Sequence, residues 1–187
     1  MAKVKLNPVM EQMRGKIGDL VFKRYEGEVI VSRKSNQTGG TPTAGQIAHR
    51  ERFRLAAVYA TGVFAVPADK KLYEDVATAR RKPAFAVAVG DYLNAPTIDV
   101  VDLAAYTGKI GDPIVIRASD DFEVVSVAVV IRTSERGILE QGPATLSQGA
   151  WRYVAQTTVD LTAGALAIDI TASDRPGNKT MKTVTKT

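Results

Sequence analysis

The alternation of apolar and polar residues in the second half of the sequence limits the fold more than any other feature does. From Thr97 onward, apolar residues fill alternate positions in four runs, at residues 114–118, 125–131, 151–155 and 166–172. Residues two positions apart in a strand face the same side of a sheet. Turn-forming segments such as "SERG" and "GPATLSQGA" separate the runs. The pattern therefore predicts an antiparallel β-sandwich in which each strand buries one face.

Two short β-rich runs near the N-terminus predict a β-hairpin. They cover Leu20–Tyr25 and Val29–Arg33, and Gly27 between them suits a tight turn. The segment that follows, "SNQTGGTPT", is rich in Gly and Thr and contains a Pro, so we expect a loop there.

Helical spacing then replaces the strand pattern. Thr43 and Gln46 fit a capping box at the start of a helix, and apolar residues over 53–64 form a stripe at helical spacing. A second, shorter helix is predicted within residues 67–82. The segment 84–94 fits both a helix and a strand, and we favour the helix because Pro83 precedes it.

The residue types that are missing exclude several kinds of catalytic and metal site. The chain has no cysteine and a single histidine, His49, which excludes disulfides, a thiol nucleophile, a cysteine zinc site and a multi-histidine site within one chain. The repeated segment "GKIGD", at Gly15–Asp19 and Gly108–Asp112, lacks the spacing of a phosphate-binding loop. No nucleophile elbow is present. We therefore expect no enzyme activity and no cofactor.

Charge is distributed unevenly along the chain. Residues 1–96 carry 16 Lys and Arg against 9 Asp and Glu, whereas residues 97–187 carry 9 against 11. The asymmetry indicates two parts with different surfaces, of which the basic first part suits an acidic partner.

Targeting signals are not evident in the sequence. No apolar run has the length of a signal peptide or a membrane helix. We expect synthesis in the cytoplasm without a classical signal peptide and no membrane association, with a virion or an extracellular assembly left open as the final location.

A resemblance supports the sandwich. The segments "GDPIVIRASDDFEVVSVAVVIRTSERGILEQG", "WRYVAQ" and "LTAGALAIDITASDRPGNKT" are similar to bacterial immunoglobulin-like sandwich domains, which occur in surface, secreted and phage structural proteins. The shared features are a strand ending in A-x-D, alternating valines, a Gly-bearing hairpin, a W-x-Y strand and a closing A-S-D-x-x-G-N. The N-terminal segment "RGKIGDLVFKRYEGEVIVSRKSN" resembles the opening of uncharacterised bacterial proteins, in which it lies ahead of such a sandwich. This resemblance implies no activity.

Together these features predict an α+β N-terminal segment followed by an all-β immunoglobulin-like sandwich. The first segment, residues 1–96, would hold the hairpin and two or three helices, and the sandwich would cover residues 97–187. Such sandwiches serve as spacers, adhesins, oligomerisation units and sugar-binding modules alike, so the fold alone does not decide the function.

We expect a non-enzymatic structural subunit of a larger assembly, such as a phage-like particle, an injection apparatus or a surface filament. Its partners would be further copies of the chain or other subunits, because the edges of a hairpin can add strands to a neighbour. The predicted contact residues in the hairpin are Leu20, Phe22, Tyr25, Val29 and Val31.

A basic helical face supports an alternative function, that of a nucleic-acid-binding adaptor. His49, Arg50, Arg52 and Arg54 lie on neighbouring turns of the predicted helix and could meet phosphates or an acidic partner. Glu51 lies among them, and no DNA-binding motif accompanies them, so a solvated or interface face is the competing interpretation.

Two similar acidic segments, "RASDDFEV" and "TASDRPGN", end predicted strands that could reach the same end of the sandwich. Asp120, Asp121, Asp174 and Asn178 would then supply oxygen ligands for calcium. The competing interpretation is that each Asp accepts hydrogen bonds from the amides of its own turn.

Three aromatic residues leave a third function open, that of an accessory module that binds carbohydrate or a cell surface. Trp151, Tyr153 and Tyr106 could stack on sugars, but the alternating strand positions of the first two favour packing in the core.

Overall fold

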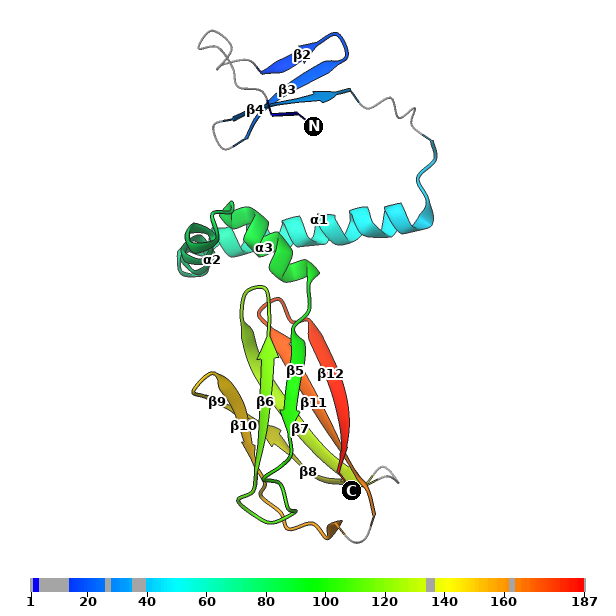
Figure 1. Cartoon of the computed structure of the whole chain (residues 1–187), viewed down its shortest axis with the longest axis vertical. Helices are drawn as coiled ribbons and strands as arrows, with labels where there is room; N and C mark the ends of the chain where they lie inside the picture. The colour runs from blue at the N-terminus through cyan, green and yellow to red at the C-terminus, as the bar shows by residue number, and fades with distance from the viewer. Residues whose placement is uncertain are drawn as a thin grey trace. The chain divides into compact units, whose positions relative to one another are not determined.

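The computed structural model describes most of the chain, namely residues 2–3, 14–25, 28–34, 40–133, 137–161 and 164–186. These residues form a mixed α+β fold with three helices and antiparallel sheets (Figure 1). The chain packs as two units, Met1–Ala44 and Gly45–Thr187. Each unit is described separately below, as the N-terminal unit and the main unit.

The N-terminal unit contains a four-stranded antiparallel sheet of strand order β1-β4-β3-β2. Its strands are β1 (Ala2–Lys3), β2 (Gly15–Ile17), β3 (Leu20–Tyr25) and β4 (Glu28–Arg33). Strands β3 and β4 pair from Leu20 opposite Arg33 to Tyr25 opposite Glu28, which confirms the predicted hairpin. The predicted turn residue Gly27 lies outside the described residues.

Three helices open the main unit: α1 (Ala44–Ala65), α2 (Pro67–Arg80) and α3 (Ala84–Leu93). Helix α1 begins directly after Thr43, the predicted cap. Helix α2 begins with Pro67, whose missing amide hydrogen costs nothing in the first turn. It ends at Arg80, and the capping residue Arg81 adopts a left-handed conformation with φ 53°. In the ambiguous segment 84–94, Ala84–Leu93 form helix α3, as favoured, and Asn94 is its extended capping residue.

The helices share a small core built largely from short side chains. Its buried members are Ala56, Ala60, Tyr73, Ala77, Val87, Ala88 and Val89. Only the two alanines are buried in α1. The predicted apolar stripe is therefore wrong at Phe53, which is 50% exposed, because α1 contributes small residues rather than bulky ones to this core.

Two four-stranded antiparallel sheets form the rest of the main unit. The first has the order β5-β6-β10-β9, with β5 (Thr97–Asp102), β6 (Pro113–Ser119), β10 (Ala150–Val154) and β9 (Thr145–Ser147). The second has the order β12-β11-β7-β8, with β12 (Lys179–Lys186), β11 (Leu166–Asp174), β7 (Val124–Thr133) and β8 (Ile138–Pro143). The segment "GPATLSQGA", predicted as a turn, contains β9, a three-residue edge strand.

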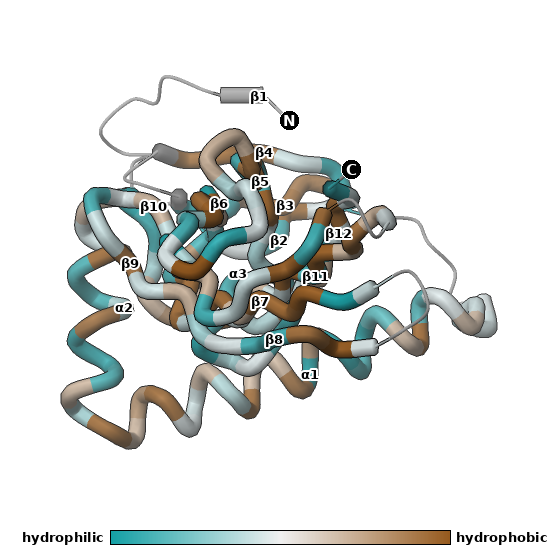
Figure 2. Tube along the Cα trace, turned by 90° about the horizontal axis from the view of Figure 1, so that it is seen from below, coloured by the Kyte–Doolittle hydropathy of each residue, from teal (hydrophilic) through white to brown (hydrophobic). Residues whose placement is uncertain are grey.

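Apolar side chains from both sheets form one core. Along β11, buried and half-buried residues alternate over the whole strand, and Ile168 and Ile170 are completely buried. Hydrophobic stretches of the strands, such as those in β7 and β8, are visible in Figure 2. Trp151, Tyr153 and Tyr106 all belong to this core, in agreement with the packing interpretation. The residues that alternate in the sequence therefore place one face of each central strand in the core.

The helices lie at one end of the two sheets, beside the turns between β6 and β7 and between β11 and β12 (Figure 1). The expected boundary near residue 96 falls inside the main unit, between α3 and β5. Contacts across this boundary hold the two parts together. The ring of Phe122, from the β6–β7 turn, stacks on Tyr73 of α2 with 4.1 Å between ring centroids.

Candidate functional site

Three acidic side chains meet where the helices adjoin the turns of the sheets. Asp91 lies on α3, Asp120 follows β6, and Asp174 is the last residue of β11. One carboxylate oxygen from each residue lies within 4.8 Å of the other two. Asp91 is completely buried and Asp174 is 4% exposed. We call these three residues the carboxylate centre.

The turn between β11 and β12 fixes Asp174. Its Oδ1 accepts hydrogen bonds from the backbone amides of Gly177 and Asn178, at 2.9 and 2.6 Å. Gly177 has φ 96°, a conformation that favours glycine. This arrangement agrees with the interpretation that the aspartate accepts hydrogen bonds from its own turn.

The turn between β6 and β7 fixes Asp120 in the same way. The Oδ2 atom of Asp120 accepts hydrogen bonds from the backbone amides of Phe122 and Glu123, at 3.0 and 3.2 Å. Its Oδ1 atom is buried and has no hydrogen-bond partner among the described residues. One oxygen of this carboxylate thus serves the turn, while the other remains available to a ligand.

Helix α3 supplies the third carboxylate. Asp91 Oδ2 accepts a hydrogen bond from the Tyr73 hydroxyl, which itself lies 2.9 Å from the hydroxyl of Tyr59. Asp91 Oδ1 is buried without a hydrogen-bond partner in the described part of the chain. Burial raises the pKa of Asp91 to about 7, and the nearby charges of Asp120 and Asp174 act in the same direction.

Asn178 joins the β11–β12 turn to the end of α3. Its side-chain nitrogen lies 2.7 Å from Asp174 Oδ2 and 3.2 to 3.4 Å from the carbonyl oxygens of Asp91, Tyr92 and Asn94. The amide nitrogen therefore faces Asp174. Asn178 acts here as a donor that positions the carboxylate and closes the end of the helix.

The predicted ligand Asp121 lies beside the carboxylate centre. Its Oδ2 accepts a hydrogen bond from the side-chain amide of Asn94. Both residues line a cavity of about 320 Å³, which also reaches Asp120. The structure thus brings Asp120 and Asp174 together, as predicted, and places Asp121 at the rim of the adjoining cavity.

Sequence reasoning missed Asp91. The signal that could have revealed it is a single acidic residue within the otherwise apolar helix "AFAVAVGDYL". A carboxylate is rarely buried without a partner. An acidic residue at a buried helical position therefore indicates either a hydrogen-bonding partner or a ligand.

Arg175 follows Asp174 directly in the sequence. Its guanidinium group forms ion pairs with two acidic residues outside the carboxylate centre. Its Nη2 lies 2.6 Å from Asp69 Oδ1 at the start of α2, and its Nη1 lies 3.7 Å from Glu123 Oε2. The positive charge of Arg175 opposes the rise in the pKa of Asp91 but does not outweigh burial.

The four basic residues predicted on α1 do not form one free surface. Arg54 forms an exposed ion pair with Glu51 at 2.6 Å, and Arg52 donates a hydrogen bond to the carbonyl oxygen of Leu93 at 3.0 Å. Within the described residues, only His49 and Arg50 of this set have no ion pair or hydrogen bond. Half of the predicted phosphate-binding face is therefore already engaged.

The predicted contact residues of the hairpin differ in exposure. Leu20 is 42% exposed, Phe22 and Val31 are half-buried, and Val29 is buried. Phe22 and Val31 are paired opposite each other across β3 and β4. The side chain of Tyr25 lies outside the described residues.

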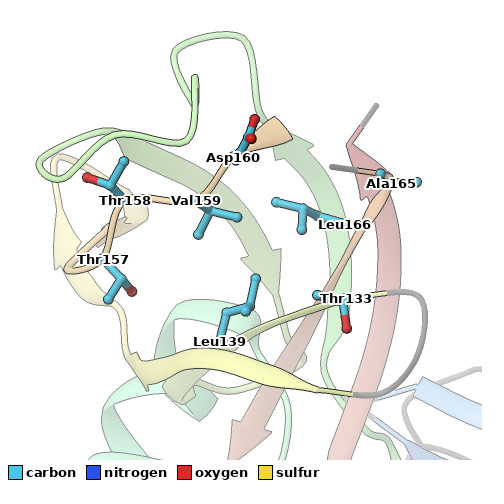
Figure 3. A pocket seen from close by; sticks show the side chains of 9 residues that line it. Thr133, Leu139, Thr157, Thr158, Val159, Asp160, Ala165 and Leu166 are labelled. Carbon is cyan, nitrogen blue, oxygen red and sulfur yellow. The ribbon is translucent and has the colours of Figure 1, made fainter. Parts of the chain in front are cut away.

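A second cavity, of about 300 Å³, lies beside the end of β7, the start of β11 and the segment that follows β10 (Figure 3). Leu139, Val159 and Leu166 form its apolar part, and threonines surround them. Among the described residues of the lining, Asp160 is the one with a charged side chain. No sequence motif indicated this cavity, because its lining comes from separate segments without a distinctive residue type.

Comparisons with protein-family models, with curated proteins and with solved structures find no match. Among the described residues, no helix combines the length and the hydropathy needed to cross a membrane.

Proposed function

We propose that this chain is a non-enzymatic structural subunit of a larger protein assembly, such as a phage-like particle, an injection apparatus or a surface filament. In this proposal the N-terminal unit and α1 make the contacts between subunits. The two-sheet part acts as a projecting immunoglobulin-like sandwich.

The uncovered apolar side chains of α1 carry the proposal. This helix has 22 residues, so it is about 33 Å long. Ile47, Phe53 and Val58 are 56%, 50% and 58% exposed, and apolar residues recur along the whole helix (Figure 2). A helix with apolar residues on several sides is typical of a buried position. A neighbouring subunit would bury these side chains.

The sheet of the N-terminal unit supports a contact role as well. All three residues of its edge strand β2 are exposed, and Ile17 is 59% exposed. An exposed edge strand offers unpaired backbone groups to a strand of another chain. Leu20, at the start of β3, adds further apolar surface beside this edge.

The two-sheet part supports the projecting role through its resemblance to bacterial immunoglobulin-like domains. Its sheets are antiparallel, share one core and carry the aromatic residues of the "WRYV" strand inside that core. Domains of this kind recur in surface and phage structural proteins, and many of them have no catalytic role.

Charge substitutions on α1 test the proposal. We expect the wild-type chain to form a discrete oligomer, and we expect Phe53→Glu and Val58→Glu to convert it to monomers, because burying an unpaired carboxylate in an interface is costly. Multi-angle light scattering over a range of concentrations measures this. The matched control is Val125→Glu on β7, since Val125 is 49% exposed.

The oligomer should persist in the Val125→Glu control, and circular dichroism should show that all three variants are folded. A wild-type chain that stays monomeric at every concentration would count against the proposal. Assembly of the α1 variants at the wild-type level would exclude α1 as the contact.

A further inference from the structure

We propose that Asp91, Asp120 and Asp174 bind a calcium ion that joins α3 to the β6–β7 and β11–β12 turns. This site is independent of the proposed assembly function. It differs from the ligand set predicted from the sequence, because Asp91 of α3 supplies a ligand, whereas Asp121 and Asn178 do not.

The spacing of the carboxylate centre fits calcium. Calcium binds oxygen ligands at about 2.3 to 2.6 Å, so oxygens on opposite sides of the ion lie about 5 Å apart. The three carboxylate oxygens lie within 4.8 Å of one another. Magnesium needs shorter distances of about 2.0 to 2.1 Å and a regular octahedron. The spacing is compatible with calcium, and calcium also tolerates an irregular set of ligands from a helix and two turns, whereas magnesium demands a near-ideal octahedron.

Unpartnered oxygens give a second, independent indication of a ligand. Asp91 is completely buried, and its Oδ1 accepts no hydrogen bond from any described residue. Asp120 Oδ1 is also buried and accepts no hydrogen bond from a described residue. Buried polar atoms nearly always have a partner, and leaving one without a partner is costly. A bound cation would satisfy both atoms at once.

The balance of charges around the three carboxylates also favours a bound cation. Three carboxylates lie together in a site that is largely shielded from water, and like charges at this distance repel one another strongly. The hydroxyls of Tyr73 and Tyr59 are neutral donors. Arg175 is held by Asp69 and Glu123. A divalent cation would supply the compensating charge that Arg175, which is shared with Asp69 and Glu123, provides only in part.

The surroundings provide room for water ligands and for entry of the ion. Calcium takes six to eight oxygen ligands, often including water. The cavity of about 320 Å³ adjoins Asp120 and is lined by polar residues, among them Asn94, Thr97 and Ser119. Three carboxylates from the protein together with waters from this cavity can complete the coordination.

A proton on Asp91 is the rival explanation for the carboxylate centre. A neutral Asp91 would also relieve the repulsion, and the two turns would hold Asp120 and Asp174 in place without any metal. The two explanations differ in one respect: only the calcium site predicts that added calcium stabilises the protein through all three residues.

Thermal unfolding of the full-length chain tests the site. The protein is dialysed against EDTA and then measured at pH 7.5 in EDTA, in calcium chloride and in magnesium chloride. At calcium concentrations about 100-fold above the dissociation constant, we expect Tm to rise by about 5 °C or more. Magnesium should have a smaller effect. Isothermal titration calorimetry with calcium chloride should give one ion per chain.

Asparagine variants identify the ligands. Asp91→Asn, Asp120→Asn and Asp174→Asn should each remove most of the calcium-dependent rise in Tm. Asp121→Asn is the matched control, because Asp121 lies beside the centre and is exposed, and it should keep the rise. In EDTA, Asp91→Asn should unfold at a Tm equal to or above that of the wild type, because it removes a buried charge.

Three results would overturn the proposal. The first is a wild-type Tm that does not respond to calcium at about 10 mM, which exceeds the dissociation constants of weak extracellular calcium modules. The second is a full calcium response in Asp91→Asn. The third is a larger response to magnesium than to calcium, which would overturn the assignment of the ion.

Discussion

At the scale of single residues, burial and charge conflict most strongly at Asp91. The side chain is completely buried, one oxygen accepts a hydrogen bond from Tyr73, and two other carboxylates lie nearby. Burial is the main reason why the pKa of Asp91 is raised to about 7. In the absence of a cation, ionisation of this group should therefore oppose folding.

This conflict predicts how stability depends on pH in EDTA. The pKa of Asp91 rises from 3.8 to about 7 on folding, so the folded state binds more protons than the unfolded state between these values. The contribution of Asp91 is fully present below pH 4 and is lost as pH rises to about 7. Because one pKa unit corresponds to about 1.4 kcal/mol, the loss is up to about 4 kcal/mol.

Urea unfolding of the wild type and of Asp91→Asn between pH 4 and pH 8 measures this effect. The variant should lose the decline in free energy of unfolding that the wild type shows over this range. The groups that interact with Asp91, namely Tyr59, Tyr73, Asp120, Asp174 and Arg175, remain in both proteins. Parallel curves for the two proteins would show that Asp91 does not titrate in this range.

At the scale of elements, the contacts between α3 and the β11–β12 turn unite the helices with the sheets. Asn178 alone reaches three carbonyl oxygens at the end of α3 and the carboxylate of Asp174. Arg175, in the same turn, binds Asp69 of α2. A short turn between two strands thus fixes two helices.

Replacing Asn178 with alanine tests this connection. The variant leaves Asp174 Oδ2 and the carbonyl oxygens of α3 without their donor, so we expect the free energy of unfolding to fall by about 1 to 3 kcal/mol. Relative to the wild type, the rate of amide hydrogen exchange should increase more in α3 than in β7. The control is Lys179→Ala at the neighbouring exposed position, which should change stability by less than about 0.5 kcal/mol. Equal losses in both variants would contradict the proposed role of Asn178.

The elements also show which parts of the fold the sequence predicts. The central strands β7, β10 and β11 are visible as alternating apolar residues because each buries one face in the core. Strand β12 was not predicted, because this edge strand, "KTMKTVTK", is mostly polar. The hairpin and the helices carried local turn and capping signals, and those signals do not depend on tertiary contacts.

The carboxylate centre, too, could be predicted only in part from the sequence. Asp120 and Asp174 could be predicted to lie close together, because similar segments end strands at the same end of the sheets. Asp91 could not, since its place in the centre depends on how α3 packs against two distant turns. Packing between elements of this kind leaves little trace in a single sequence.

At the scale of the whole molecule, the two units differ in how much core they possess. The main unit has two apolar clusters, whereas in the described part of the N-terminal unit Val29 is the single buried apolar residue. A small sheet with so little core gains stability when a neighbour covers it. This difference supports the contact role that we propose for the N-terminal unit.

The mass in solution, measured by sedimentation velocity for the full chain and for residues 45–187, tests the assembly proposal most directly. We expect the full chain to sediment as a discrete oligomer that dissociates on dilution. At the same concentrations, the shorter chain should be folded and should contain fewer subunits per particle. Two monomers, or two identical oligomers, would contradict the assignment of subunit contacts to the N-terminal unit.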